Sequence, residues 1–351
     1  MPDQTNTMLQ LTAGRVFTDH ITARELAAAE SGAWPAAAWT AIESAGLARA
    51  LLPEAAGGYG VEPAEALSIL TVAGAHALPL PLPETMLAGW LLAGAGLAMP
   101  DGPLSVAPVR LGDALALTPR GAGWHLSGTV RRIPWGRNIT ALAALAMHRG
   151  APMVALVPAT GWTVRPAANL ALEPRDTLDI AVDLPAAAVA PAGPDGGQLR
   201  AVGAALRSQQ IAGALGQLVA MTTQYALDRT QFGRPIGKFQ AVQHNLALLA
   251  GQAAAAAAAA DGAAEAVSPL RLLPIAAAKQ RCGEAAGIGA AIAHQVHGAI
   301  GFTYEHSLHY LTKRLWSWRD EFGRETEWAA LLGRHMAEAG PDRLWLEITA
   351  A

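Results

Sequence analysis

The sequence has little cysteine, little net charge and no export signal. Cys282 is the single cysteine in 351 residues, which excludes an internal disulfide framework and any multi-cysteine zinc or iron–sulfur site, and a cytoplasmic location is expected. The formal net charge is −3 and basic runs are absent, so the chain lacks the electrostatic footprint of nucleic-acid-binding proteins. Residues 1–14 are polar and do not resemble a secretory signal.

Long apolar runs are scarce as well. The longest unbroken one, Met86–Pro100, is diluted by glycine and alanine and is shorter than the roughly 20 residues that span a bilayer. Although 52% of the residues are hydrophobic, the excess is mostly alanine, which favours closely packed helices. We therefore expect a soluble protein with no membrane partner.

Two shifts in pattern divide the chain into three predicted domains. Helical spacing dominates residues 1–103, short alternating runs separated by glycine and proline fill residues 104–190, and helical spacing returns over residues 198–351. We expect an N-terminal helical domain, a middle antiparallel β-barrel or sandwich, and a C-terminal four-helix bundle. The predicted fold class is mainly α with a small central β domain.

Individual elements follow from the same patterns. The alanine run at 253–260 is predicted to be a low-bulk helical surface, and residues 190–197 a linker. The proline-rich segment 79–83 is predicted to be an extended connector. A fourth bundle helix is predicted to carry Leu308 through Phe322. The other predicted helices are 22–30, 35–45 and 63–77, and the predicted strands are 114–118, 124–133, 141–147, 153–157 and 178–184.

Common nucleotide and metal motifs are not matched. The glycines at 94–96 and 287–289 lie in helical surroundings and do not follow a strand, so a Rossmann site is not expected. Residues 233–238 lack the spacing and the hydroxyl residue of a Walker motif. No carboxylate sits at the helical spacing that would complete a metal site with either histidine pair, His294 with His297 or His306 with His309.

Two C-terminal segments differ from ordinary bundle sequence. In the first, residues 228–240, a helix ends, a glycine and proline turn follows, and a new helix begins. Arg229 could reach a phosphate and Phe232 offers a flat apolar face, although an ordinary turn with a capping arginine remains an open alternative. Gln231 and Gln240 add hydrogen-bonding groups. The second segment, residues 295–308, ends a helix with two glycines that would let a ligand approach the backbone closely.

In this order the two segments resemble the acyl-CoA dehydrogenase family, which carries Arg-x-x-Phe-Gly-x-x-Ile-x-x-x-Gln and, later, Gln-x-x-Gly-x-x-Gly-Phe. The resemblance implies a tetrameric FAD flavoprotein that oxidises an acyl-CoA thioester to the 2-enoyl-CoA and passes electrons to an electron-transfer flavoprotein. It also implies that Arg229, Gln231 and Phe232 reach the FAD of a neighbouring subunit, and that Gln295 and Gly298 meet its adenosine and pyrophosphate end. The matching residues are Arg229, Phe232, Gly233, Ile236 and Gln240, then Gln295, Gly298, Gly301 and Phe302.

The chain departs from this family in the sheet domain and at the catalytic base. Residues 106–117 match the Thr-Glu-Pro-x-x-Gly-Ser-Asp signature poorly, and residues 132–136 replace the flavin-contacting segment, which leaves Trp135 as the candidate flavin contact. Glu321 lies one or two residues before the usual base position and is the candidate base, with a surface ion pair to Arg319 or Arg324 as its alternative role. The other known base position corresponds to about Gly203, which has no side chain.

Three functions therefore stay open. The chain is either a complete acyl-CoA dehydrogenase that uses Glu321 or Asp320 as base, or a base-lacking subunit that completes the FAD site of a larger catalytic subunit in a heteromer. An oxidase or flavin monooxygenase of the same architecture is the third reading. The missing features and the short length favour the heteromeric subunit. Fatty-acyl, aromatic, dicarboxylic and steroid side-chain thioesters are all open as substrates.

Overall fold

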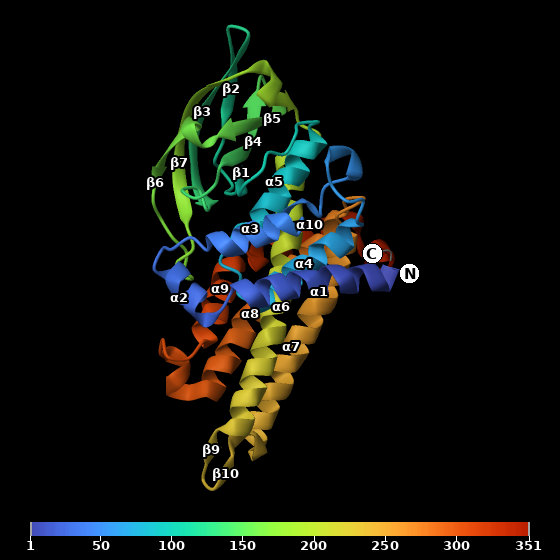
Figure 1. The fold of residues 1–351 in the computed structure, drawn as a ribbon. Coiled ribbons are helices and arrows are strands. Elements are labelled where there is room, and N and C mark those ends of the chain that lie inside the picture. The colour runs from blue at the N-terminus through green and yellow to red at the C-terminus, as the bar shows by residue number, and fades with distance from the viewer. Residues whose placement is uncertain (1, 350–351) are drawn as a thin grey trace. The chain divides into compact units, whose positions relative to one another are not determined.

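The computed structural model describes residues 2–349 and divides the chain into two compact units. The first comprises the residues up to Ala66 together with Pro79–Gly203, and the second comprises Leu67–Leu78 together with the residues from Ala204 onward. The predicted division into three domains stays a prediction. The mainly helical fold with a central sheet is confirmed (Figure 1).

Helices of the first unit pack through small and aromatic side chains. Buried Phe17, Trp39 and Ile42 bring α1 and α3 together. Helix α5 packs against the first strand of the sheet, and it begins at Leu82 with Pro83 in its first turn. The predicted extended connector is therefore wrong at its C-terminal end, because a proline in the first helical turn has no hydrogen bond to lose. The bounds are α1 (Pro2–His20), α2 (Ala23–Glu30), α3 (Ala36–Ser44), η1 (Leu47–Arg49), η2 (Glu54–Ala56) and α5 (Leu82–Gly94).

The sheet of the first unit has eight strands in the order β6-β7-β3-β2-β4-β5-β8, with β1 paired to β4. Most pairs are antiparallel, as predicted, but β1 and β2 both run parallel to β4, so the sheet is mixed. Alternation along a strand reports which face is buried and not the direction of its neighbours, which is why the sequence did not reveal this. The strands are β1 (Leu104–Ala107), β2 (Ala116–Arg120), β3 (Gly123–Pro134), β4 (Ala141–His148), β5 (Ala151–Pro158), β6 (Trp162–Arg165), β7 (Arg175–Leu184) and β8 (Val189–Pro191), with η3 (Ala159–Gly161) and η4 (Ala186–Ala188) between them.

Long helices dominate the second unit. Helices α6 and α7 are joined by a short hairpin at one end and run side by side, and α7 packs along α8 (Figure 1). The predicted fourth helix ends at Trp318, before Phe322, and the predicted linker is wrong at both ends because Val189–Pro191 is a strand and α6 begins at Gly196. The bounds are α4 (Pro63–Ala75), α6 (Gly196–Asp228), η5 (Ile236–Lys238), α7 (Gln240–Glu265), α8 (Leu272–His297), η6 (Gly298–Phe302), α9 (Leu308–Trp318), α10 (Glu325–Ala339), η7 (Pro341–Arg343) and α11 (Leu344–Thr349).

Alanines make α7 slender and apolar. Ala253, Ala256 and Ala260 are buried, and the run is helical as predicted. Among the described residues, α7 is the one helix long and apolar enough to cross a membrane by length and composition, with 28% of its apolar window buried. Polar residues interrupt its sequence, so it does not form an unbroken apolar run. A single such helix is weak evidence, since a helix packed within a bundle passes the same test.

Glycines allow α4 and α6 to approach each other closely. A side chain at Gly213 would overlap the Thr71 carbonyl oxygen, and one at Gly74 would overlap the Gln210 carbonyl oxygen. Gly216 lies on the same helix as Gly213, but a side chain there would meet open space. The crossing therefore depends on the missing side chains of Gly74 and Gly213.

Replacing Gly213 by alanine is expected to lower the free energy of unfolding by about 1–3 kcal/mol, because the new methyl group must push the two helices apart. The matched control, Gly216→Ala, is expected to raise it by about 0.5–1 kcal/mol through helix propensity. Urea unfolding of both variants checks this, and equal effects of the two substitutions would contradict the close crossing.

Candidate functional site

A hairpin at the end of α6 presents the first of the two predicted segments. Strands β9 (Thr230–Gln231) and β10 (Arg234–Pro235) pair in antiparallel register around Phe232 and Gly233. Both turn residues have positive φ, +52° and +80°, which suits a tight two-residue hairpin but strains a phenylalanine. Phe232 is 92% exposed as a result. The strained backbone therefore holds the Phe232 ring in an almost fully exposed position.

Contacts at the hairpin base hold this projection in place. The Arg234 guanidinium lies 4.3 Å above the Phe239 ring, and the rings of Phe232 and Phe239 meet edge to face at 6.1 Å. The Ile236 amide donates to the Arg229 carbonyl oxygen over 2.8 Å. Arg229, Gln231 and Gln240 are exposed, so their polar groups are free to meet an external ligand.

The second predicted segment ends helix α8. Gly298 follows the helix with φ of +63° and ψ of −143°, and a side chain there would meet nothing within 4 Å. Gln295 and Gly298 are both exposed. The Tyr225 hydroxyl donates to the His297 carbonyl oxygen over 3.2 Å, and its ring stacks on that of His297 at 4.4 Å. Because Tyr225 lies one helical turn before Arg229, the structure brings the two segments together at one end of the bundle.

Trp135 lies in the other unit. It is 6% exposed with φ of +59°, and its ring meets the Trp34 ring edge to face at 6.0 Å. The candidate flavin contact is therefore packed against an aromatic side chain of its own unit. Its role toward a flavin stays a prediction.

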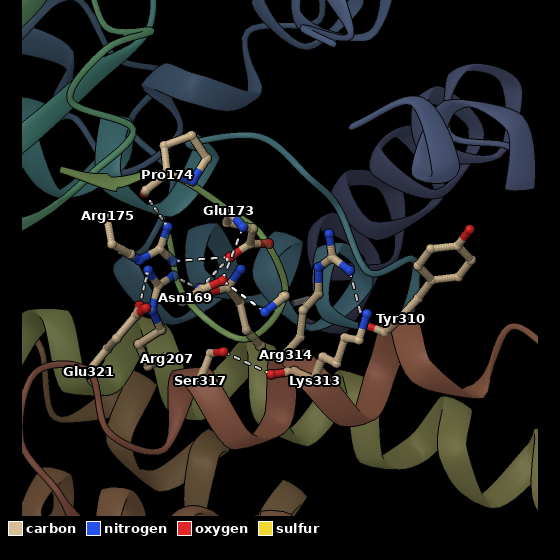
Figure 2. A network of polar contacts seen from close by, with 12 residues as sticks. Asn169, Glu173, Pro174, Arg175, Arg207, Tyr310, Lys313, Arg314, Ser317 and Glu321 are labelled. Atoms are coloured by element: carbon tan, nitrogen blue, oxygen red, sulfur yellow. Dashed lines mark hydrogen bonds and ion pairs between the residues drawn. The ribbon is translucent and has the colours of Figure 1, made fainter. Parts of the chain in front are cut away.

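Glu321 is paired with an arginine that the sequence analysis did not consider. Nε and Nη2 of Arg207 lie 2.8 and 2.7 Å from Oε2 of Glu321, and Arg207 is 1% exposed (Figure 2). The structure pairs Arg319 with Glu325 and Arg324 with Asp320, and it pairs Glu321 with Arg207, a partner that was not predicted. Helix α9 ends at Trp318, so the chain turns after it and Glu321 faces α6 rather than solvent. Proton abstraction by this carboxylate would have to break the ion pair.

A buried lysine holds the loop that carries Glu321. Nζ of Lys279, on α8, donates to the carbonyl oxygens of Arg319 and Gly323 over 2.7 and 2.8 Å, and the side chain is fully buried. Burial lowers the pKa of Lys279 to about 8, against the opposing effect of nearby Glu321 and Glu325. A neutral amine keeps two N–H donors, which match these two carbonyl acceptors.

Sequence reasoning missed Arg207, Lys279 and Tyr225. A signal for the first two existed, because each cation directly follows apolar residues of a predicted helix, 204–206 before Arg207 and 275–278 before Lys279. Such residues are rarely buried unless they are paired, so they mark an internal polar network. Nothing in the sequence indicated which carboxylate or carbonyl groups they would meet.

The residues around the hairpin fit one edge of an FAD site. Arg229 supplies a guanidinium for a phosphate, Phe232 an uncovered ring, and Gly298 a backbone with open space beside it. Residues 2–349 contain no group of three or more histidine, cysteine, aspartate or glutamate side chains arranged to hold a metal ion. The edge is thus suited to an organic anion with an aromatic part.

Known proteins that are similar to this chain are acyl-CoA dehydrogenases. Residues 201–319 match the family model for the acyl-CoA dehydrogenase C-terminal domain. The chain is 29% identical over 316 residues to acyl-CoA dehydrogenase IpdE2 of Mycobacterium tuberculosis, covering 89% of this chain and 91% of that protein. It is 30% identical over 285 residues to acyl-CoA dehydrogenase FadE34 of the same organism, covering 77% of this chain and 38% of that protein. A solved variant of the Tcur3481-Tcur3483 steroid ACAD is similar, with a TM-score of 0.85, 27% identity and coverage of 97% and 99%.

Lys279 is expected to give the stability a distinct dependence on pH. Between pH 8 and 10.5 the unfolded chain binds this proton more than the folded one does, so the free energy of unfolding rises with pH in that window. One pKa unit corresponds to about 1.4 kcal/mol, so the rise amounts to about 3 kcal/mol. Chemical unfolding of the wild type and of Lys279→Met at several pH values in this range checks the prediction, because the variant should lack the rise. The same substitution at exposed Lys238 is the control. A Lys279→Met curve parallel to the wild type would contradict it.

Proposed function

Because the chain belongs to the acyl-CoA dehydrogenase family, we propose that it works as a subunit of an FAD-dependent enzyme that converts an acyl-CoA thioester to its 2-enoyl-CoA. The observation that carries this proposal is the pairing of the hairpin with the Gly298 turn at one end of the second unit. Family likeness and site geometry thus point to the same edge of the chain.

FAD, when bound, would accept the β-hydrogen of the substrate as hydride. The chain's own residues bind and orient the cofactor in this proposal. The Arg229 guanidinium neutralises phosphate charge, the exposed Phe232 ring packs on an aromatic part of the ligand, and the open backbone at Gly298 lets a phosphate approach. An exposed edge without a covering residue is suited to an FAD held mainly by a neighbouring subunit.

A more specific proposal is that this chain lacks the base and completes the FAD site of a heteromeric enzyme. The ion pair between Glu321 and the buried Arg207 supports it, because Oε2 of the candidate base lies 2.8 and 2.7 Å from two nitrogens of that guanidinium. The other base position, near Gly203, lies buried on α6 without a side chain. A carboxylate of a larger partner subunit would then remove the α-proton of the substrate.

The remaining parts of the proposal concern substrate, acceptor and location. A similar structure is named a steroid ACAD, which supports a steroid-derived thioester over a simple fatty-acyl one. We propose an electron-transfer flavoprotein as the acceptor and an oligomeric assembly in the cytoplasm, where the lone buried Cys282 stays reduced. Turnover of the purified assembly with both thioester classes, with oxygen uptake monitored, separates these choices from an oxidase.

Replacing Glu321 by glutamine tests its role. If Glu321 serves only the ion pair, kcat of the assembled enzyme stays within about threefold of the wild type, while the free energy of unfolding falls by about 3 kcal/mol because Arg207 remains buried without its counter-charge. Steady-state kinetics and urea unfolding measure the two effects. Asp320→Asn, at the neighbouring and more exposed carboxylate, is the control. A loss of kcat by a factor of a thousand or more would identify Glu321 as the base instead.

Phe232→Ala tests the hairpin edge. Losing one aromatic contact is worth about 1.4 kcal/mol, so the Kd for FAD of the assembled enzyme is expected to rise about tenfold with an unchanged unfolding midpoint. Flavin fluorescence titration measures the Kd. Leu170→Ala, at an exposed apolar residue of the other unit, is the control. An unchanged Kd for Phe232→Ala would remove the hairpin from the cofactor site.

A further inference from the structure

One tyrosine joins the two segments of the proposed FAD edge. Tyr225 lies in the last turn of α6, its hydroxyl donates to the His297 carbonyl oxygen over 3.2 Å, and its ring stacks on His297 with 22° between the planes. The His306 ring meets both others edge on, at 4.7 Å from His297 and 6.0 Å from Tyr225. Three rings from separate stretches of the chain thus form one cluster, Tyr225, His297 and His306, which we call the ring cluster.

The ring cluster is connected directly to the hairpin. The Arg229 amide donates to the Tyr225 carbonyl oxygen over 2.9 Å, and the Arg229 carbonyl oxygen accepts the Ile236 amide that closes the hairpin. A displacement of Tyr225 is therefore transmitted to the backbone of Arg229 through a single helical turn.

The ring cluster is connected equally directly to the Gly298 turn. His297 is the last residue of α8, and the final carbonyl oxygens of a helix have no partner within the helix. The Tyr225 hydroxyl supplies that partner from another helix. A side chain at Gly301 would lie 3.0 Å from Cβ of His297, so the turn folds back tightly against the same residue.

We propose that Tyr225 is a positioning residue, which holds the hairpin and the Gly298 turn in one fixed arrangement so that both meet the FAD together. This inference rests on the proposed function, since it concerns the same edge. Tyr225 need not touch the cofactor, because it acts through the backbone at Arg229 and at His297.

Protonation of the histidines should weaken this connection. Nδ1 of His297 lies 2.8 Å from the Ala293 carbonyl oxygen, and no described residue bonds its buried Nε2. Burial lowers the pKa of His297, and so do His306 from across the cluster and His294 from its own helix; the pKa of His306 is likewise lowered by burial and by His309. Because the folded state holds this pKa below the ordinary histidine value, the stability that neutral His297 contributes is lost as the pH falls from that ordinary value through the lowered pKa.

Hydrogen exchange of the full-length protein in the absence of added FAD tests the connection. Tyr225→Phe removes the hydroxyl alone, and Tyr225→Leu removes the ring as well. We expect exchange of amides in 229–236 and 298–303 to accelerate together, about fivefold for the phenylalanine variant since one hydrogen bond is lost, and more for the leucine variant. Lowering the pH from 7.5 to 5.5 should accelerate the same amides in the wild type after correction for intrinsic rates. Tyr304→Phe, at an exposed tyrosine of the neighbouring loop, is the control and should leave both segments unchanged.

Acceleration in only one of the two segments, or none in either, would overturn the proposal. Uniform acceleration over the whole second unit with a matching fall in the unfolding midpoint would also overturn it, because Tyr225 would then be an ordinary packing residue. FAD titration of the assembled enzyme is the second readout, in which the Kd should rise about fivefold or more for Tyr225→Phe. Coupled exchange with an unchanged Kd would leave the connection standing and instead remove this edge from the FAD site.

Discussion

The second unit depends on keeping buried charges paired. Arg207 and Lys279 lie buried among apolar helices, and removing an unpaired ionic group from water costs several kcal/mol. Glu321 and Glu325 supply the opposite charges, and two backbone carbonyl oxygens accept hydrogen bonds from Nζ of Lys279. The network ties α6, α8 and the loop after α9 to one another. These contacts fix the loop that contains the family's usual base position. Glu321, the candidate base in that loop, is one of the groups that hold it in place.

The pairing of Glu321 with Arg207 explains why we assign FAD binding to this chain and proton abstraction to a partner subunit. A carboxylate that must neutralise a buried arginine is poorly suited to accept a substrate proton, because protonation would leave the arginine charge without a counter-charge. The opposite end of the bundle is built differently, with Phe232 and Arg229 exposed on a strained hairpin. The ion pair of Arg207 and Glu321 thus stabilises the fold, whereas the exposed Arg229 and Phe232 are available to bind another molecule.

Helical and strand periodicity predicted most of the fold. Alternation along 178–184 and the alanine-rich pattern of α7 follow from one-dimensional rules, and both appear in the structure. The parallel pairing of β1 with β4 depends on how distant strands meet, which periodicity does not encode. The loop after α9 includes Phe322 with positive φ, a conformation that is uncommon for an aromatic residue and that the sequence did not indicate. Motif spacing located Arg229 and Gly298, but the partner of Glu321 lies 114 positions away along the chain and became visible only in three dimensions.

We propose that this chain completes an FAD site without supplying the base, so that it needs a partner to form a working enzyme. The most direct test is the absorption spectrum of the chain purified alone, before and after an acyl-CoA is added. We expect a colourless protein that gains flavin only when it is co-expressed with a larger acyl-CoA dehydrogenase subunit. A yellow homo-oligomer with one flavin in each chain, bleached by the acyl-CoA, would contradict it.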